Sequence, residues 1–236
     1  MVADRIPAGK SLISPPSHCF KCGRRLELRD LIPIVSYIQL RGKCRFYGEK
    51  ISCRSLLVEA VTGTIFILAW LQLGLGWQLL STLILCCIFI VVFIIDLENT
   101  SVPGIIIYPA IAIALALAAG NQYLSGGPGI ISSISGFALG MGIFLAIWLI
   151  SRLFKKNIIA FSDATIMGLI GASVGFPLII LALYLAVLAG GMSVVMLIIF
   201  KLRKWNEHMP FGPFASTSAV LVLIWGNNIW QWCMKV

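Results

Sequence analysis

The stretch Leu79–Asp96, LLSTLILCCIFIVVFIID, decides the fold class, because it is an apolar run that ends on a carboxylate. Its length approaches the ~20 apolar residues with which an α-helix crosses a bilayer. A second aspartate, Asp163, lies six residues into the apolar run that opens at Asn157. A charged side chain toward the bilayer interior costs roughly 2.5–3.5 kcal/mol on insertion scales, so such residues usually face a bundle interior or a wet cavity and mark function. We therefore take Asp96 and Asp163 as the candidate functional centre.

The composition of the whole chain indicates an integral membrane protein. Hydrophobic residues make up 59% of the chain and charged residues 11%, whereas about 25% of the residues of a soluble domain are charged. The net charge of +9 could suggest a nucleic-acid partner, but eleven of the 18 basic residues lie in 1–54 and most of the others in 152–156 and 201–204. Basic residues confined to alternate loops are the orientation signal of a multi-pass membrane protein, so we expect membrane lipid and no nucleic acid as a partner.

Apolar runs of about the right length predict an all-α, polytopic membrane helix bundle of about seven transmembrane helices. It follows a small N-terminal cytoplasmic domain that contains cysteines, with the domains at 1–55 and 56–236. This topology puts every basic loop on the inner side of the plasma membrane and both aspartates near the cytoplasmic face, Asp163 about 9 Å in from Asn157 at 1.5 Å per residue. The predicted spans are 56–75, 78–96, 103–120, 129–151, 157–175, 178–200 and 211–230.

Two carboxylates from separate helices at one depth can share a proton and titrate as a coupled pair, with one ionised as a base and one neutral as an acid. Such a pair can activate a water for amide hydrolysis. Asp96 beside Glu98 and Asn99 also fits an ordinary interfacial helix end. By the residues alone, an intramembrane aspartyl protease and a proton-coupled transporter both stay open.

Several motifs in order along the chain resemble those of the type IV prepilin peptidases. The first ones fall in the cysteine-containing segment and the later ones in the predicted membrane helices. They are PPSHCFKCG at 15–23, DLIPIVSY at 30–37, LRGKCR at 40–45, LVEAVTG at 57–63, IDLE at 95–98 and MPFGPF at 209–214.

This resemblance implies an intramembrane aspartic endopeptidase, a hydrolase in which Asp96 matches the first catalytic aspartate and Asp163 the aspartate of the GxGD motif. The implied substrate is a type IV prepilin or pilin-like protein, with a short basic leader that ends in Gly before an apolar helix. Cleavage is expected on the cytoplasmic side. Many members of that family also N-methylate the new terminus with S-adenosylmethionine, so a methyltransferase activity with this cofactor is an expectation as well.

Three departures from the family pattern qualify this interpretation. Ala160 and Ser162 replace both glycines of GxGD, which removes the backbone freedom of glycine and keeps a catalytically degenerate relative as an alternative. The family ordinarily begins with one more membrane helix, so we expect seven spans instead of eight. Small residues recur in two stripes, one of Gly136, Gly140 and Gly142 and one of Gly168, Gly171 and Gly175. The second stripe, which follows Asp163, is expected to seat its helix against that of Asp96.

The third departure concerns metal binding. The family pattern of two CxxC pairs suits a tetrahedral zinc ion, and Cys19, Cys22 and Cys44 fit it, but Tyr47 stands in the fourth position. Cys53 is our candidate for the fourth ligand, and His18 is the second choice. The other interpretation is a small domain without metal, held by the packing of Ile32, Ile34, Tyr37 and Leu40.

Overall fold

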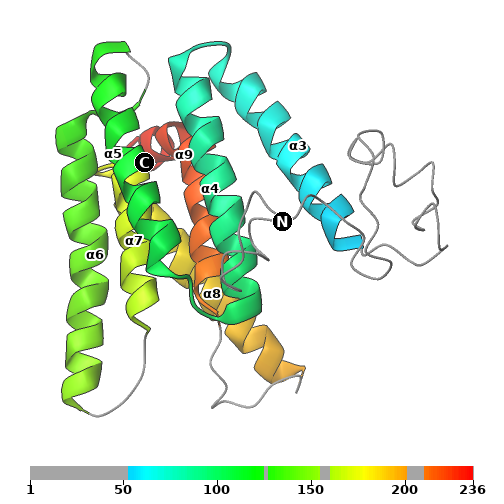
Figure 1. Cartoon of the computed structure of the whole chain (residues 1–236), viewed down its shortest axis with the longest axis vertical. Coiled ribbons are helices and arrows are strands. Elements are labelled where there is room, and N and C mark those ends of the chain that lie inside the picture. The colour runs from blue at the N-terminus through cyan, green and yellow to red at the C-terminus, as the bar shows by residue number, and fades with distance from the viewer. Residues whose placement is uncertain (1–52, 125–126, 155–159, 201–209, 236) are drawn as a thin grey trace. The chain divides into compact units, whose positions relative to one another are not determined.

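The computed structural model describes residues 53–124, 127–154, 160–200 and 210–235. Within these ranges the regular elements are seven α-helices (Figure 1). The chain falls into two compact units, Met1–Leu68 and Ala69–Val236. The helices are α3 (Cys53–Leu73), α4 (Trp77–Asn99), α5 (Gly104–Leu124), α6 (Ile130–Leu153), α7 (Phe161–Val174), α8 (Leu178–Ile199) and α9 (Gly212–Cys233).

Each of the seven predicted spans corresponds to one of these helices, so the all-α fold class is confirmed. Five of them, α3, α4, α5, α6 and α8, are long and apolar enough to cross a membrane by length and composition. The chain is therefore a multi-pass membrane protein. Helix α9 has the length of a span, but it contains hydroxyl and amide side chains such as Ser216, Ser218 and Asn227. Helix α7 has only 14 residues, or about 21 Å at 1.5 Å per residue, against a hydrocarbon core of about 30 Å.

The short helix α7 is the centre of the second unit. All of its residues from Ala164 to Val174 are buried, and it packs against α5, α6, α8 and α9. A helix enclosed by other helices is apolar on every side, and it need not match the bilayer thickness because its surroundings are protein. The span predicted at 157–175 is observed as the shorter helix Phe161–Val174, a length that this enclosure permits.

Glycines allow α6 and α7 to approach each other very closely. A Cβ atom on Gly171 would overlap the carbonyl group of Gly136, and one on Gly140 would overlap the carbonyl oxygen of Met167. Gly136 and Gly140 in α6 and Gly168 and Gly171 in α7 therefore lie on packing faces, as small residues at membrane-helix interfaces usually do. The stripe after Asp163 seats α7 against α6, so the expectation that it seats this helix against α4 was wrong.

Candidate active site

Asp96 lies in the last turn of α4 and is almost completely buried, with 1% of its surface exposed. The helix ends just beyond it, because Thr100 adopts the left-handed conformation (φ 54°) and its N–H donates to the carbonyl oxygen of Asp96 at 2.8 Å. A carboxylate oxygen, Oδ2, accepts a hydrogen bond from the backbone N–H of Gly212 at 2.9 Å. The other oxygen, Oδ1, is buried and has no hydrogen-bond partner within the described ranges.

Gly212 is the residue that holds the Asp96 side chain in place. It is the first residue of α9, with Pro213 next to it, so its N–H is among those that have no partner within the helix. The N-terminal end of a helix also attracts negative charge. There is no room for a side chain, since a Cβ atom on Gly212 would lie 2.5 Å from Oδ2 and 2.6 Å from Cγ of Asp96.

The sequence-based prediction did not include Gly212 among the site residues. It noted the stretch at 209–214 only as a motif of the resemblance. A Gly-Pro pair at the start of a predicted helix, at the cytoplasmic end that carries the two aspartates, was the available signal. A glycine followed by a proline at a helix start indicates close backbone approach and a backbone N–H group without a partner inside the helix.

Asp163 lies in the first turn of α7, and its side chain is partly buried. Its Oδ2 accepts a hydrogen bond from the backbone N–H of Ala160 at 3.1 Å, and its own N–H donates to the Ala160 carbonyl oxygen at 3.1 Å. Asp163 therefore stabilises the N-terminal end of α7, where a negative charge is favourable.

The replacement of the GxGD glycines is compatible with this local structure. Ala160 has φ −78° and ψ 151°, an extended conformation that every L-residue adopts without strain. Ser162 lies inside the first turn of α7, where its conformation is helical. The backbone at neither position requires glycine, so Ala160 and Ser162 fit the observed backbone beside Asp163 without strain.

The ends of the helices that carry Asp96, Asp163 and Gly212 lie at the same end of the bundle (Figure 1). Helices α4 and α7 both pack against α5 and α9. Two aromatic pairs link the starts of α7 and α9 to neighbouring turns of α6. They are Trp148–Phe161, with ring centroids 5.5 Å apart, and Phe144–Phe211, with centroids 5.4 Å apart. These contacts attach the beginnings of α7 and α9 to residues four positions apart on α6, about 6 Å along its axis. That the carboxyl groups of Asp96 and Asp163 contact the same water molecule stays a prediction.

The predicted metal ligands fall almost entirely outside the described residues. This is the case for Cys19, Cys22 and Cys44, for the alternatives His18 and Tyr47, and for the apolar residues of the metal-free interpretation. Cys53 is the first residue of α3. The zinc site therefore stays a prediction.

Comparison with known proteins assigns a family to both parts of the chain. Residues 1–73 match the model of the bacterial peptidase A24 N-terminal domain, and residues 83–199 match the model of the type IV leader peptidase family. No solved structure matches the chain significantly.

Three relatives, each named prepilin leader peptidase/N-methyltransferase, are similar over almost the whole chain. The one from Aeromonas hydrophila is 26% identical over 94% of this chain and 76% of its own length. The one from Xanthomonas campestris pv. campestris is 26% identical over 94% and 77%, and the one from Pseudomonas putida 27% identical over 95% and 77%. Together with the two family models, these similarities show that the chain belongs to the type IV leader peptidase family.

Proposed function

We propose that this protein is an intramembrane aspartic endopeptidase that removes the short basic leader of type IV prepilins or pilin-like proteins by cleaving after Gly. The observation that carries the proposal is the environment of Asp96. A membrane helix keeps this carboxyl group buried, with one oxygen hydrogen-bonded to Gly212 and the other without a partner in the part of the chain that the structure describes. Family membership and the names of the relatives, prepilin leader peptidase/N-methyltransferase, supply the substrate class.

An unpartnered buried oxygen lowers stability. We therefore infer that Asp96 Oδ1 interacts with a proton, a water molecule or a second carboxyl group during the reaction. Asp163, partly buried in the first turn of α7 at the same end of the bundle, is our candidate for that second carboxyl group. In the proposed reaction the ionised member of the pair takes a proton from the attacking water, and the protonated member gives its proton to the scissile amide. The bond between the leader's Gly and the next residue is then hydrolysed.

The orientation proposed for this reaction follows the distribution of basic residues. The N-terminal domain and the loops at 152–156 and 201–204 carry 17 of the 18 basic residues, and the positive-inside rule places them in the cytoplasm. The ends of α4, α7 and α9 with Asp96, Asp163 and Gly212 then lie at the cytoplasmic face of the plasma membrane. A leader of basic residues would remain on that side, next to the proposed site.

A cleavage assay tests this function against the alternatives. The full chain in liposomes is expected to shorten a prepilin that has a basic leader ending in Gly, and to leave the same prepilin intact when that Gly is replaced by a bulky residue. A proton-coupled transporter would instead show a flux driven by a pH gradient without proteolysis, and a degenerate relative would show neither activity. The absence of cleavage beside an active relative would contradict the proposal. Adding S-adenosylmethionine tests N-methylation, the second activity in the relatives' names, as a gain of one methyl group on the product.

We also propose that Cys19, Cys22, Cys44 and Cys53 hold a structural zinc ion in the N-terminal domain. Thiolates are preferred zinc ligands, and four of them complete a tetrahedral site. The purified protein is then expected to contain about one zinc ion per chain, and Cys53→Ser to lower this content. Cys233→Ser is the matched control, because Cys233 is an exposed residue of α9 outside the proposed set. Equal zinc contents in the two variants would exclude Cys53 as a ligand.

A further inference from the structure

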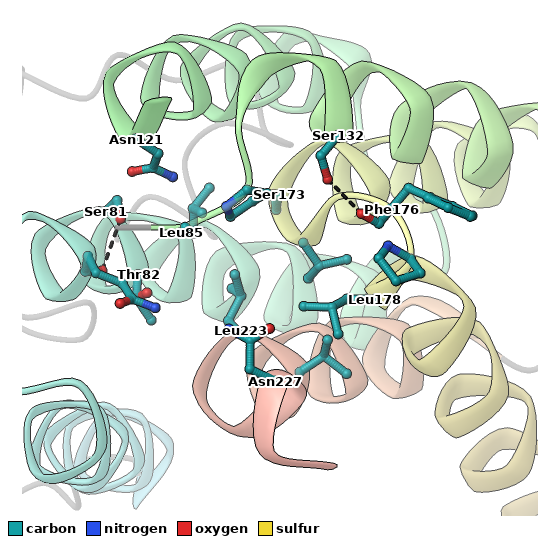
Figure 2. A pocket seen from close by; sticks show the side chains of 16 residues that line it. Ser81, Thr82, Leu85, Asn121, Ser132, Ser173, Phe176, Leu178, Leu223 and Asn227 are labelled. Atoms are coloured by element: carbon teal, nitrogen blue, oxygen red, sulfur yellow. Dashed lines mark hydrogen bonds between the residues drawn. The ribbon is translucent and has the colours of Figure 1, made fainter. Parts of the chain in front are cut away.

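A polar cavity lies at the end of the bundle opposite Asp96. It has a volume of about 290 Å³ and is formed by the start of α4, the ends of α5, α7 and α9, and the starts of α6 and α8. Gln78, one of its lining residues, is about 27 Å from Asp96 along α4 at 1.5 Å per residue. The cavity is therefore separate from the candidate active site. Its polar lining residues are Gln78, Ser81, Thr82, Asn121, Ser132, Ser173 and Asn227 (Figure 2).

The serine hydroxyl groups of this cavity offer lone pairs instead of protons. Ser81 donates its proton to the carbonyl oxygen of Gln78 at 2.9 Å, and Ser173 donates to that of Leu169 at 2.8 Å. Ser132 donates to the carbonyl oxygen of Phe176 at 2.7 Å. A hydroxyl group has one proton and two acceptor lone pairs. After these bonds are made, the three oxygens can only accept hydrogen bonds from a bound molecule.

Asn121 adds a buried acceptor without a partner. Only 7% of its surface is exposed, and its Oδ1 atom has no hydrogen-bond partner within the described ranges. The side chain extends from α5 toward the cavity (Figure 2). Gly127 packs against this amide so closely that a Cβ atom there would lie 2.7 Å from Nδ2. A buried acceptor that lacks a partner is rare, because leaving it unpaired lowers stability. A ligand that donates a hydrogen bond would supply what is missing.

The wall of the cavity beside Ser132 is preformed. The backbone N–H of Phe176 donates to the Ser132 carbonyl oxygen at 2.9 Å, while the Ser132 hydroxyl donates back to the Phe176 carbonyl oxygen. Gly175 is required between α7 and α8, since its φ is +70° and a Cβ atom would lie 2.5 Å from Ser132 Oγ. Reciprocal bonds and close backbone packing fix these acceptors before any ligand arrives, which lowers the entropy cost of binding.

The chemistry of the lining selects the class of ligand. No ionisable side chain lines the cavity in the part of the chain that the structure describes, so a charged group would lose its hydration without gaining a counter-charge. The serine oxygens and Asn121 Oδ1 can accept hydrogen bonds from a ligand, and the side-chain amides of Gln78 and Asn227 can also donate hydrogen bonds to it. Hydroxyl groups meet both demands, because each one donates and accepts. Leu85, Val222 and Leu223 complete the lining with apolar surface.

From this arrangement we propose that the cavity binds a neutral polyhydroxyl group. Its source is either the sugar headgroup of a membrane glycolipid or a free sugar, and both present the same hydroxyl chemistry to Asn121 and the serines. The apolar lining residues would contact the carbon skeleton of the sugar or the glycerol backbone of the lipid. The proposal does not depend on proteolysis, because the cavity lies at the other end of the bundle from Asp96.

Native mass spectrometry of the full chain tests this site. The protein is kept in a polyoxyethylene ether detergent, since a maltoside headgroup would itself occupy the cavity. The probes are a monoglucosyl diacylglycerol and a phosphatidylcholine with the same acyl chains. The wild-type protein is expected to retain the glucolipid about tenfold more tightly than the phosphatidylcholine, the difference that one or two well-placed hydrogen bonds supply. Displacement by free glucose would identify a free sugar as sufficient, and resistance to glucose would identify the lipid as the source.

Matched variants connect the binding to the cavity. Asn121→Leu removes the unpartnered acceptor and is expected to abolish the preference for the glucolipid. Gln122→Leu, at the neighbouring exposed amide of α5, is expected to retain it. Ser173→Ala removes one acceptor with almost no change in volume and is expected to weaken retention severalfold even if Asn121→Leu folds poorly. Equal retention of the two lipids by the wild type, or equal preference in Asn121→Leu, Ser173→Ala and Gln122→Leu, would overturn the proposal and leave a cavity that holds water only.

Discussion

Asp96→Asn and Asp163→Asn are each expected to reduce the cleavage of a prepilin leader in liposomes by at least about 100-fold, the lower bound of what a general acid or base contributes. Neither amide can take up or release a proton at neutral pH, so the proposed pair loses its base in one variant and its acid in the other. The measurement is the initial rate of leader removal at a fixed protein-to-lipid ratio. Because the carboxyl groups act as a pair, the double variant is expected to be no slower than the slower single variant.

The structure provides a control for the fold in this experiment. Asparagine has the size of aspartate, and its Oδ1 atom can still accept the hydrogen bond that Gly212 donates to Asp96. The expression level and melting temperature of Asp96→Asn should therefore stay close to those of the wild type. Glu98→Gln is the matched control for charge, because Glu98 is an exposed acid two residues further along α4. Cleavage at near wild-type rate by either aspartate variant would remove that residue from the catalytic pair.

Gly212→Ala is expected to lower kcat for leader cleavage about 100-fold while KM stays within a few-fold. The new Cβ atom would lie 2.5–2.9 Å from the Oδ2, Cγ and Cβ atoms of Asp96, closer than non-bonded atoms come in proteins. Either the carboxyl group or the start of α9 must move. A displacement of about 1 Å at a catalytic group can cost a factor of about 100 in rate. Overpacking of this kind should also destabilise the fold by about 1–3 kcal/mol.

The split between kcat and KM separates a positioning role of Gly212 from a general loss of structure. A merely destabilised enzyme would lose active molecules, and heating would inactivate it sooner, but the surviving molecules would keep the kcat of the wild type. Active-site titration with a tight-binding inhibitor, or normalisation to the folded fraction, gives that value. Gly142→Ala is the control in α6, since nothing lies within 4 Å of a Cβ atom at that position. Equal kcat values for the two alanine variants would exclude the positioning role.

The helices themselves follow from hydrophobicity along the chain. Apolar runs bounded by Gly, Pro or basic residues predicted all seven described helices, because a backbone in lipid must satisfy its polar groups within the segment. The predicted limit of the second span at 78–96 and the observed helix Trp77–Asn99 differ by a few residues. The run around Asp163 was less predictable. A helix enclosed by protein and a helix facing lipid are equally apolar, so hydropathy could not indicate that α7 is short and central.

By itself the sequence determined the class of the protein, its candidate aspartates and its family resemblance, because hydropathy, charge placement and local motifs are properties of neighbouring residues. Only the tertiary structure assigned Gly212 as the hydrogen-bond donor to Asp96, α6 instead of α4 as the packing partner of α7, and Asn121 as part of a polar cavity. These features depend on which helix faces meet at a distance of a few ångströms. Residues 116 positions apart, such as Asp96 and Gly212, carry no local signal of that contact.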